Sequence, residues 1–225
     1  MFDPAVVEPV VDFLAGSAGD GAALELSIGT GRIAIPLAAR GVRIHGIDLS
    51  EAMVARLRAK PGSDQIAVTI GDFATTRVDG RFSLAYVVFN TIGNLTSQDE
   101  QVACFQNVAD HLEPGGRFVI EVGVPDLRGL PDGERFRAFE VTQQHIGIDE
   151  YDLANQGLVS HHLSRTAEGT YDRSLTPLRF VWPSELDLMA RIAGMTLRER
   201  WGGWKREPFT STSRTHVSVW ETPTS

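Results

Sequence analysis

A glycine-rich turn between a short apolar strand and a helix limits most strongly how this chain can fold. Residues 22–28, AALELSI, have the pattern of a buried strand, and Gly29-Thr30-Gly31 follow directly. Glycines at such a turn let a ligand approach the backbone, because no Cβ atom obstructs the free N–H groups at the helix N-terminus. The tract also satisfies the dinucleotide pattern G-x-G-x-x-[GA], which on its own fits several classes of nucleotide-binding protein.

Strands and helices alternate along the first half of the chain. The pattern predicts strands at residues 42–48, 66–70, 81–89 and 116–124. Ser50 is placed to cap one helix, and Ser97 with Glu100 forms a capping box for another. Such alternation predicts an α/β fold with a doubly wound, mostly parallel sheet, whose ligand lies at the carboxyl ends of the strands.

The pattern changes after Pro125 to polar, alternating segments. Residues 135–142, 145–152, 157–164 and 171–181 predict an antiparallel β meander inserted after the fifth strand. A helix opening at Pro183 and two strands at 195–201 and 215–221 then complete the main sheet with an antiparallel hairpin. We expect one domain over residues 1–225, with residues 126–181 covering the substrate.

Composition narrows the class of protein. The 225 residues are 42% hydrophobic, which suits one sizeable core, and the net charge of −8 argues against nucleic acid as a partner. A single cysteine, the lack of a long apolar stretch and an N-terminus without positive charge predict a soluble, cytoplasmic protein away from membranes. The sequence leaves open whether the chain forms a homodimer.

Two acidic side chains follow later strands at positions that suit an adenosyl group. Asp48 ends the second strand, 17 residues beyond Gly31, where a carboxylate can accept hydrogen bonds from both ribose hydroxyls. Gly71-Asp72-Phe73 ends the third strand and would set an acidic acceptor and an aromatic ring near an adenine.

These motifs, in this order, resemble class I S-adenosylmethionine-dependent methyltransferases over nearly the full chain. The resemblance is to enzymes that act on small molecules, including those that dimethylate amino sugars, and it implies a Rossmann-like seven-stranded sheet with S-adenosylmethionine as cofactor. It implies that residues 25–31 hold the methionine part, and that residues 89–95 line the cleft. Ser27 departs from the family pattern, which usually has glycine there. The implied cofactor residues are Glu25, Ser27, Gly29, Thr30, Gly31, Arg32, Asp48, Leu49, Ser50, Met53, Gly71, Asp72, Phe73, Phe89 and Asn90.

A nicotinamide-dependent oxidoreductase is the alternative enzyme class, since it shares the glycines and Asp48. Glu25 disfavours it, because the first strand of such enzymes is uniformly apolar; Gly71-Asp72 and the C-terminal strand pair also fit a methyltransferase better. A non-catalytic cofactor-binding protein on the same fold is the remaining alternative.

The methyl acceptor is the least specified part of the prediction. A small molecule is expected, and Asn90-Thr91-Ile92-Gly93 lacks the proline tract usual in enzymes that methylate nucleobase amines. We favour nitrogen over oxygen as the acceptor atom, because an amine needs only to be neutral whereas an aliphatic hydroxyl needs a positioned base. No residue spacing suits a metal.

Candidate residues at the acceptor are polar or aromatic side chains of the insert and its borders, each of which could equally be a solvated strand residue. His161 and His162 are the candidate bases, and strand alternation lets only one of them point into the cleft. With Asn90 they form the candidate catalytic set. The candidate substrate-binding residues are Asn94, Tyr151, Tyr171, Arg179 and Trp182.

Overall fold

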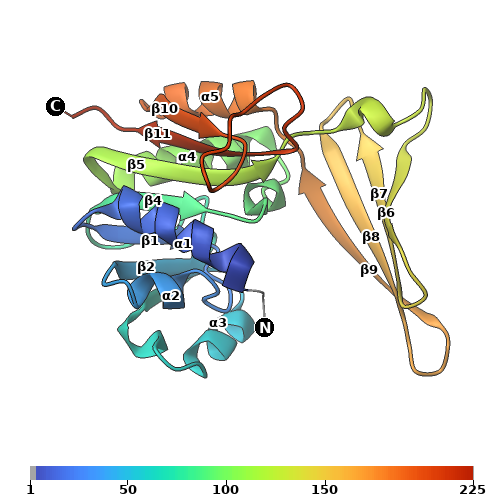
Figure 1. Ribbon diagram of the computed structural model, residues 1–225, viewed down its shortest axis with the longest axis horizontal. Helices are drawn as coiled ribbons and strands as arrows, with labels where there is room; N and C mark the ends of the chain where they lie inside the picture. Colours follow the sequence, from blue (N-terminus) through green and yellow to red (C-terminus); the bar gives the residue numbers. More distant parts are fainter. Residues whose placement is uncertain (1–3, 225) are drawn as a thin grey trace.

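A computed structural model describes residues 4–224 of the chain, which form two β-sheets and their covering helices (Figure 1). The main sheet has seven strands in the order β10-β11-β5-β4-β1-β2-β3. All neighbours are parallel except the pairs that β11 makes with β5 and β10. The strands are β1 (Ala22–Leu26), β2 (Arg43–Asp48), β3 (Ala67–Ile70), β4 (Phe82–Val87), β5 (Leu112–Gly123), β10 (Thr196–Trp201) and β11 (Thr215–Glu221). The predicted mostly parallel sheet with an antiparallel hairpin is confirmed.

Helices cover both faces of this sheet and create two apolar cores. On one face lie α1 (Pro4–Ala18), α2 (Ala34–Ala38) and α3 (Glu51–Arg58), with Leu14, Leu37 and Leu57 fully buried. On the other lie α4 (Gln98–His111) and α5 (Pro183–Ile192), where Phe105 and Trp220 pack edge to face. Three short 3₁₀ helices, η1 (Ser63–Gln65), η2 (Thr91–Asn94) and η3 (Leu127–Gly129), lie in connections.

The helix starts follow the predicted capping chemistry. Ser50 Oγ accepts a hydrogen bond from the Met53 backbone N–H at the start of α3. Ser97 and Glu100 form the reciprocal capping box of α4. Pro183 occupies the first turn of α5, where its missing N–H costs no helical hydrogen bond.

The second sheet is the predicted meander, β6 (Phe136–Val141), β7 (His145–Asp152), β8 (Gly157–Arg165) and β9 (Tyr171–Arg179). It stands beyond the carboxyl ends of the parallel strands (Figure 1). Its end nearest the main sheet is anchored by Arg179, which donates hydrogen bonds to Gln101 of α4 at 2.5 Å and Glu185 of α5 at 2.6 Å. Leu178, the preceding residue of β9, packs against Gly93 of η2.

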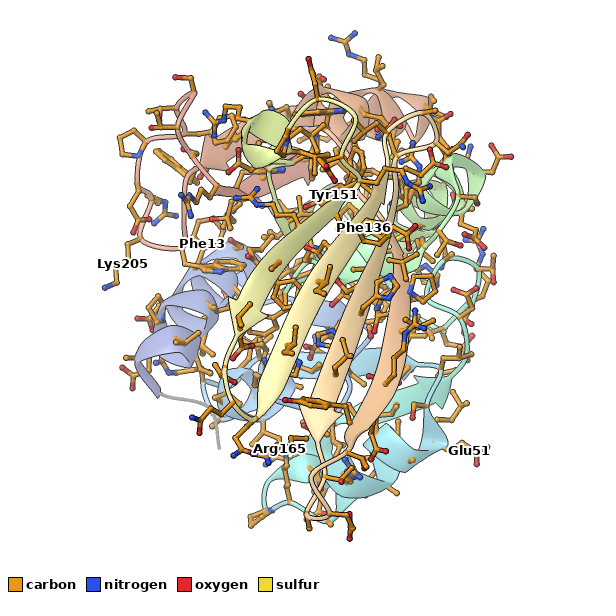
Figure 2. The ribbon with its side chains drawn as sticks, turned by 90° about the vertical axis from the view of Figure 1, so that its right-hand side faces the viewer. Phe13, Glu51, Phe136, Tyr151, Arg165 and Lys205 are labelled. Carbon is orange, nitrogen blue, oxygen red and sulfur yellow. The ribbon has the colours of Figure 1, made fainter. Side chains whose placement is uncertain are left out.

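Strand pairing divides the side chains of this second sheet between two faces. We call the face that includes Leu178 the inner face, because Leu178 contacts η2 beside the carboxyl edge of the main sheet. Register places Asp149, Tyr151, Leu158, Ser160, His162, Ser174 and Thr176 on this inner face. The opposite, outer face carries Ile146, Ile148, Val159, His161, Leu163 and Leu175, and Figure 2 views the sheet from that side.

Candidate active site

A cavity of about 310 Å3 opens at the carboxyl ends of β1, β2 and β4. Its walls come from the glycine-rich turn, the end of β2, the start of α3 and the segment after β4. The lining residues are Glu25, Ser27, Ile28, Gly29, Thr30, Arg32, Ile33, Asp48, Met53, Val88, Phe89 and Thr91. Eight of the predicted cofactor residues are therefore brought together in one cavity.

The turn after β1 has left-handed backbone at alternate residues. The φ angles of Ser27, Gly29 and Gly31 are 60°, 55° and 72°. A Cβ atom on Gly31 would lie 2.5 Å from Cδ1 of Leu57, so the turn can pack against α3 only with glycine there. Ser27, the departure from the family pattern, adopts the same conformation that glycine would take.

Asp48 ties the end of β2 to this turn. Its Oδ2 accepts a 2.6 Å hydrogen bond from the Gly29 N–H, and its Oδ1 accepts one of 2.8 Å from the Ser50 N–H. Because each carboxylate oxygen has two lone pairs, both oxygens can still accept from a ligand hydroxyl. The buried Asp48 carboxylate is thus oriented by the backbone before a ribose arrives.

Glu25 lies at the end of β1 on the floor of the cavity, where its buried carboxyl contacts the buried phenol of Tyr86. Burial raises the pKa of Glu25 to about 8; the hydrogen bond from Tyr86 opposes this, and the charge of Asp48 adds to it. A cationic ligand in the cavity would favour the ionised carboxylate.

The segment after β4 is a strained turn held by β5. Phe89 and Asn90 both have positive φ, 57° and 60°, which is unfavourable for residues with side chains. Glu121 of β5 accepts a 2.6 Å hydrogen bond from the Phe89 N–H, and Asn90 Oδ1 accepts one of 3.0 Å from the Gly123 N–H. The turn presents the Phe89 ring to the cavity, with the guanidinium of Arg32 stacked 4.6 Å from its centroid.

Asn90 is therefore a residue that holds this turn: its side-chain oxygen is bonded to backbone, which argues against its predicted catalytic role. Glu121, which sequence reasoning missed, fixes the same turn, and burial raises its pKa. Tyr86, also missed, lies in an apolar strand whose pattern indicates only core.

The end of β3 corrects one prediction about the adenine. Asp72 stays exposed and its Oδ1 accepts a 2.8 Å hydrogen bond from the Ala74 N–H. The Phe73 ring, however, is only 8% exposed and belongs to the core beneath α4, so it does not form an open wall for a base. Gly71 is required because a Cβ atom there would lie 2.2 Å from Oγ1 of Thr76. Leu49, beside Asp48, is the exposed apolar side chain at this end of the cavity.

The two histidines of β8 lie on opposite faces of the second sheet. His161 is on the outer face, where Glu150 and Arg173 contact its two ring nitrogens at 3.1 and 2.9 Å. His162 is on the inner face, and its Nδ1 lies 3.0 Å from Nε2 of His145. Nδ1 of His145 in turn lies 2.9 Å from a carboxylate oxygen of Glu140. We call Glu140, His145 and His162 the inner-face relay.

The structure places the predicted substrate residues at different positions. Arg179 is buried in the pairs with Gln101 and Glu185, which argues against its predicted substrate role. Tyr171 lies on the outer face at the end of β9 far from Arg179, turned away from the main sheet. Tyr151 is on the inner face, where its ring packs with Phe180. Asn94 is exposed in η2.

Trp182 precedes α5 and lines a second cavity of about 650 Å3, together with Pro125, Arg200 and Phe209. This cavity opens beside the residues that follow β5. Trp204, by contrast, covers α1, since its ring packs on Phe13.

Comparison with known proteins agrees with this geometry. Residues 23–116 match the methyltransferase domain family. The cypemycin N-terminal methyltransferase of a Streptomyces species is 30% identical over 210 residues, 88% of this chain and 82% of that protein. The chain belongs to the S-adenosylmethionine-dependent methyltransferases.

Solved structures of methyltransferases superpose on nearly the whole chain. The CcbJ methyltransferase from Streptomyces caelestis has a TM-score of 0.88 and 35% identity, covering 98% of this chain and 90% of that one. An amino pentose methyltransferase from Micromonospora echinaspora, solved with S-adenosylmethionine bound, has a TM-score of 0.73 and 22% identity, covering 96% and 89%. The nicotinamide-dependent alternative is therefore wrong.

The residues of the methyltransferase's first cavity fit S-adenosylmethionine. The Gly29–Gly31 turn leaves backbone open to the ligand, Asp48 offers oriented acceptors for hydroxyls, and Glu25 offers an acid near a cationic group. Within residues 4–224, no three His, Cys, Asp or Glu side chains are grouped as metal ligands. No helix in the described part of the methyltransferase has the length and apolarity to cross a membrane.

Proposed function

We propose that the methyltransferase transfers a methyl group to an amine nitrogen of a small molecule held between the cofactor cavity and the inner face. The observation that carries the choice of nitrogen is the acidic inner face, where Glu140 and Asp149 would attract a cationic amine, and the inner-face relay adds a base that can deprotonate it there. Relatives support nitrogen, since the cypemycin enzyme is named an N-terminal methyltransferase and a solved neighbour is an amino pentose methyltransferase. We propose the four-stranded sheet as the substrate-covering part of one domain.

The relay fixes which nitrogen of His162 is basic. The Glu140 carboxylate accepts the Nδ1–H of His145, so Nε2 of His145 has the lone pair and accepts the Nδ1–H of His162. Nε2 of His162 then carries a free lone pair.

Such a base suits an amine that arrives as an ammonium ion. When bound, S-adenosylmethionine supplies an activated methyl carbon on a sulfonium. His162 Nε2 takes one proton from the ammonium, and the freed nitrogen lone pair forms the new N–C bond as the C–S bond breaks. The sulfonium of a bound cofactor would become a thioether, and the proton on His162 passes to water. Orientation by the Phe89 turn and exclusion of water supply the rest of the catalysis.

Acidic side chains on the same face favour a cationic acceptor. Asp149 accepts a short hydrogen bond from Ser160, and Glu140 lies at the end of the relay. These carboxylates would attract an amine before its deprotonation. Asn94, Tyr151 and Trp182 remain the proposed substrate contacts: Asn94 is exposed in η2, Tyr151 lies on the inner face, and Trp182 lines the second cavity.

A label-transfer screen tests the proposal. Radiolabelled S-adenosylmethionine is incubated with the protein and pools of amino sugars, amino acids, short peptides with free N-termini, and hydroxylated analogues that lack the amine. We expect label only in pools containing an amine. Transfer to the hydroxylated pools alone would contradict the proposal.

The pH profile of a matched pair of variants tests the base. His162→Ala should lower the rate about tenfold at pH 7, and the loss should disappear as rising pH deprotonates the amine in solution. His161→Ala, on the outer face of the same strand, should retain the wild-type profile. Equal losses in both variants at every pH would argue against the relay.

A further inference from the structure

Two successive residues after β4 hold a backbone conformation that their side chains disfavour. The φ angles of Phe89 and Asn90 are 57° and 60°, and a residue other than glycine enters this left-handed region only at a cost in free energy. Such strain persists where neighbouring groups fix the conformation, and it is concentrated at functional sites. The contacts that fix this turn therefore bear on what the turn does.

A side chain of β5 holds the turn where the pairing of β4 with β5 has ended. The last paired residues are Val87 and Ile120. Beyond them the Phe89 N–H donates a 2.6 Å hydrogen bond to the Glu121 carboxylate, and the Asn90 N–H donates one of 3.2 Å to the Glu121 backbone carbonyl. A carboxylate accepts shorter and stronger hydrogen bonds than a neutral group does. One residue of β5 therefore holds both strained residues.

Glu121 reaches the cofactor cavity through this turn and not by direct contact. Phe89 and Arg32 line the cavity and stack on each other, whereas Glu121 is not one of the lining residues. Glu121 is half-buried, and burial raises the pKa of its carboxyl while the N–H groups of Phe89 and Asn90 lower it by favouring the ionised form. The hydrogen bonds to the turn thus offset the solvation that the carboxylate loses.

We propose that Glu121 is a positioning residue for S-adenosylmethionine, which holds the Phe89 turn in place as a wall of the cofactor cavity. Without an acceptor for its N–H, Phe89 is free to relax toward right-handed backbone, and this would move its ring away from Arg32. The hydrogen bond has this role, and the negative charge of Glu121 does not act on the sulfonium. The inference concerns cofactor binding alone, so it does not depend on which atom accepts the methyl group.

Two variants of similar size separate the hydrogen bond from the charge. Glu121→Gln keeps an oxygen that can accept from the Phe89 N–H, and Glu121→Met fills the same space without a strong acceptor. Calorimetry measures binding of S-adenosylmethionine, whose sulfonium is cationic, and of S-adenosylhomocysteine, whose thioether is neutral. We expect Glu121→Met to bind both ligands about tenfold more weakly, and Glu121→Gln to stay within about threefold of the wild type for both. Glu113→Met, at the other end of β5, is the matched control and should bind as the wild type does.

A double-variant cycle tests whether Glu121 acts through Phe89. Phe89→Ala removes the ring, so adding Glu121→Met to it should weaken cofactor binding by less than about a further twofold. Thermal unfolding without cofactor checks that each variant is folded. Losses that add fully in the double variant would overturn the proposal. So would a loss that is confined to S-adenosylmethionine and equal in both Glu121 variants, because the charge would then act on the sulfonium, and so would wild-type binding of both ligands by Glu121→Met.

Discussion

The phenol of Tyr86 donates a 2.8 Å hydrogen bond to the carboxyl of Glu25 directly beneath the cofactor cavity, and both side chains are buried. Burial, the largest cause, raises the pKa of Glu25 from 4.5 to about 8. The folded state thus keeps this proton to higher pH than the unfolded chain. The stabilising contribution is fully present below about pH 4.5 and is lost as pH rises through about 8.

Glu25→Gln should remove that pH dependence. We expect the free energy of unfolding of the wild type to fall between pH 5.5 and pH 8.5, and the Gln variant to show a smaller fall, measured by denaturant titration at both values. Tyr86→Phe is the control, because it removes the hydrogen bond but leaves the titrating carboxyl. If the free energy of unfolding changed with pH equally in the wild type and in Glu25→Gln, Glu25 would not be the titrating group.

Binding of S-adenosylmethionine should release a proton from Glu25, since the cationic ligand favours the carboxylate. Calorimetry at pH 7 in two buffers of different ionisation enthalpy measures this release. We expect a buffer-dependent enthalpy for the wild type and a much smaller dependence for Glu25→Gln. A buffer-independent wild-type enthalpy would rule out the linkage.

Asp48→Ala should weaken cofactor binding by about 1–3 kcal/mol, or roughly 5- to 150-fold, because the ribose hydroxyls and the Gly29 N–H lose their acceptor. Asp64→Ala, an exposed change on η1, should bind as the wild type does. The comparison is made by calorimetric titration. Equal affinity in both variants would show that the ribose lies elsewhere.

Arg179→Met should destabilise the fold and leave the acceptor KM nearly unchanged. The change leaves Glu185 without its buried cation. Breaking a fully buried ion pair costs about 3–5 kcal/mol, and we expect less here because Glu185 is partly exposed. Thermal unfolding and steady-state kinetics below the melting temperature separate the two effects. A large rise in KM with unchanged stability would restore the substrate role that the sequence suggested.

Chelation should not affect activity, since the described residues contain no grouped metal ligands and the proposed chemistry uses none. The measurement is the initial rate after dialysis against EDTA. Loss of activity that magnesium restores would contradict this and would point to a metal-assisted hydroxyl acceptor.

The main sheet was predictable because each of its signals is local. Gly29 and Gly31 mark the turn after β1 because their own backbone has positive φ, and the caps at Ser50 and Ser97 are formed within three residues. Alternation in the insert also predicted its four strands and the opposite orientation of His161 and His162.

The parts that sequence reasoning missed depend on contacts between distant segments. Glu121 holds the Phe89 turn from another strand, and the relay joins β6, β7 and β8. Likewise Arg179 looks like any polar strand residue until α4 and α5 supply its partners. Phe73 follows a strand end as an adenine-contacting ring would, yet it folds into the core.

The position of the transferred methyl group tests the central claim most directly. An accepted amine is incubated with the protein and S-adenosylmethionine carrying a deuterated methyl group, and the product is fragmented by mass spectrometry. We predict that the label lies on the amine nitrogen and that His162→Ala forms the same product more slowly at neutral pH. Label on an oxygen, as an ether or ester, together with collapse of activity in one histidine variant at every pH, would contradict the account.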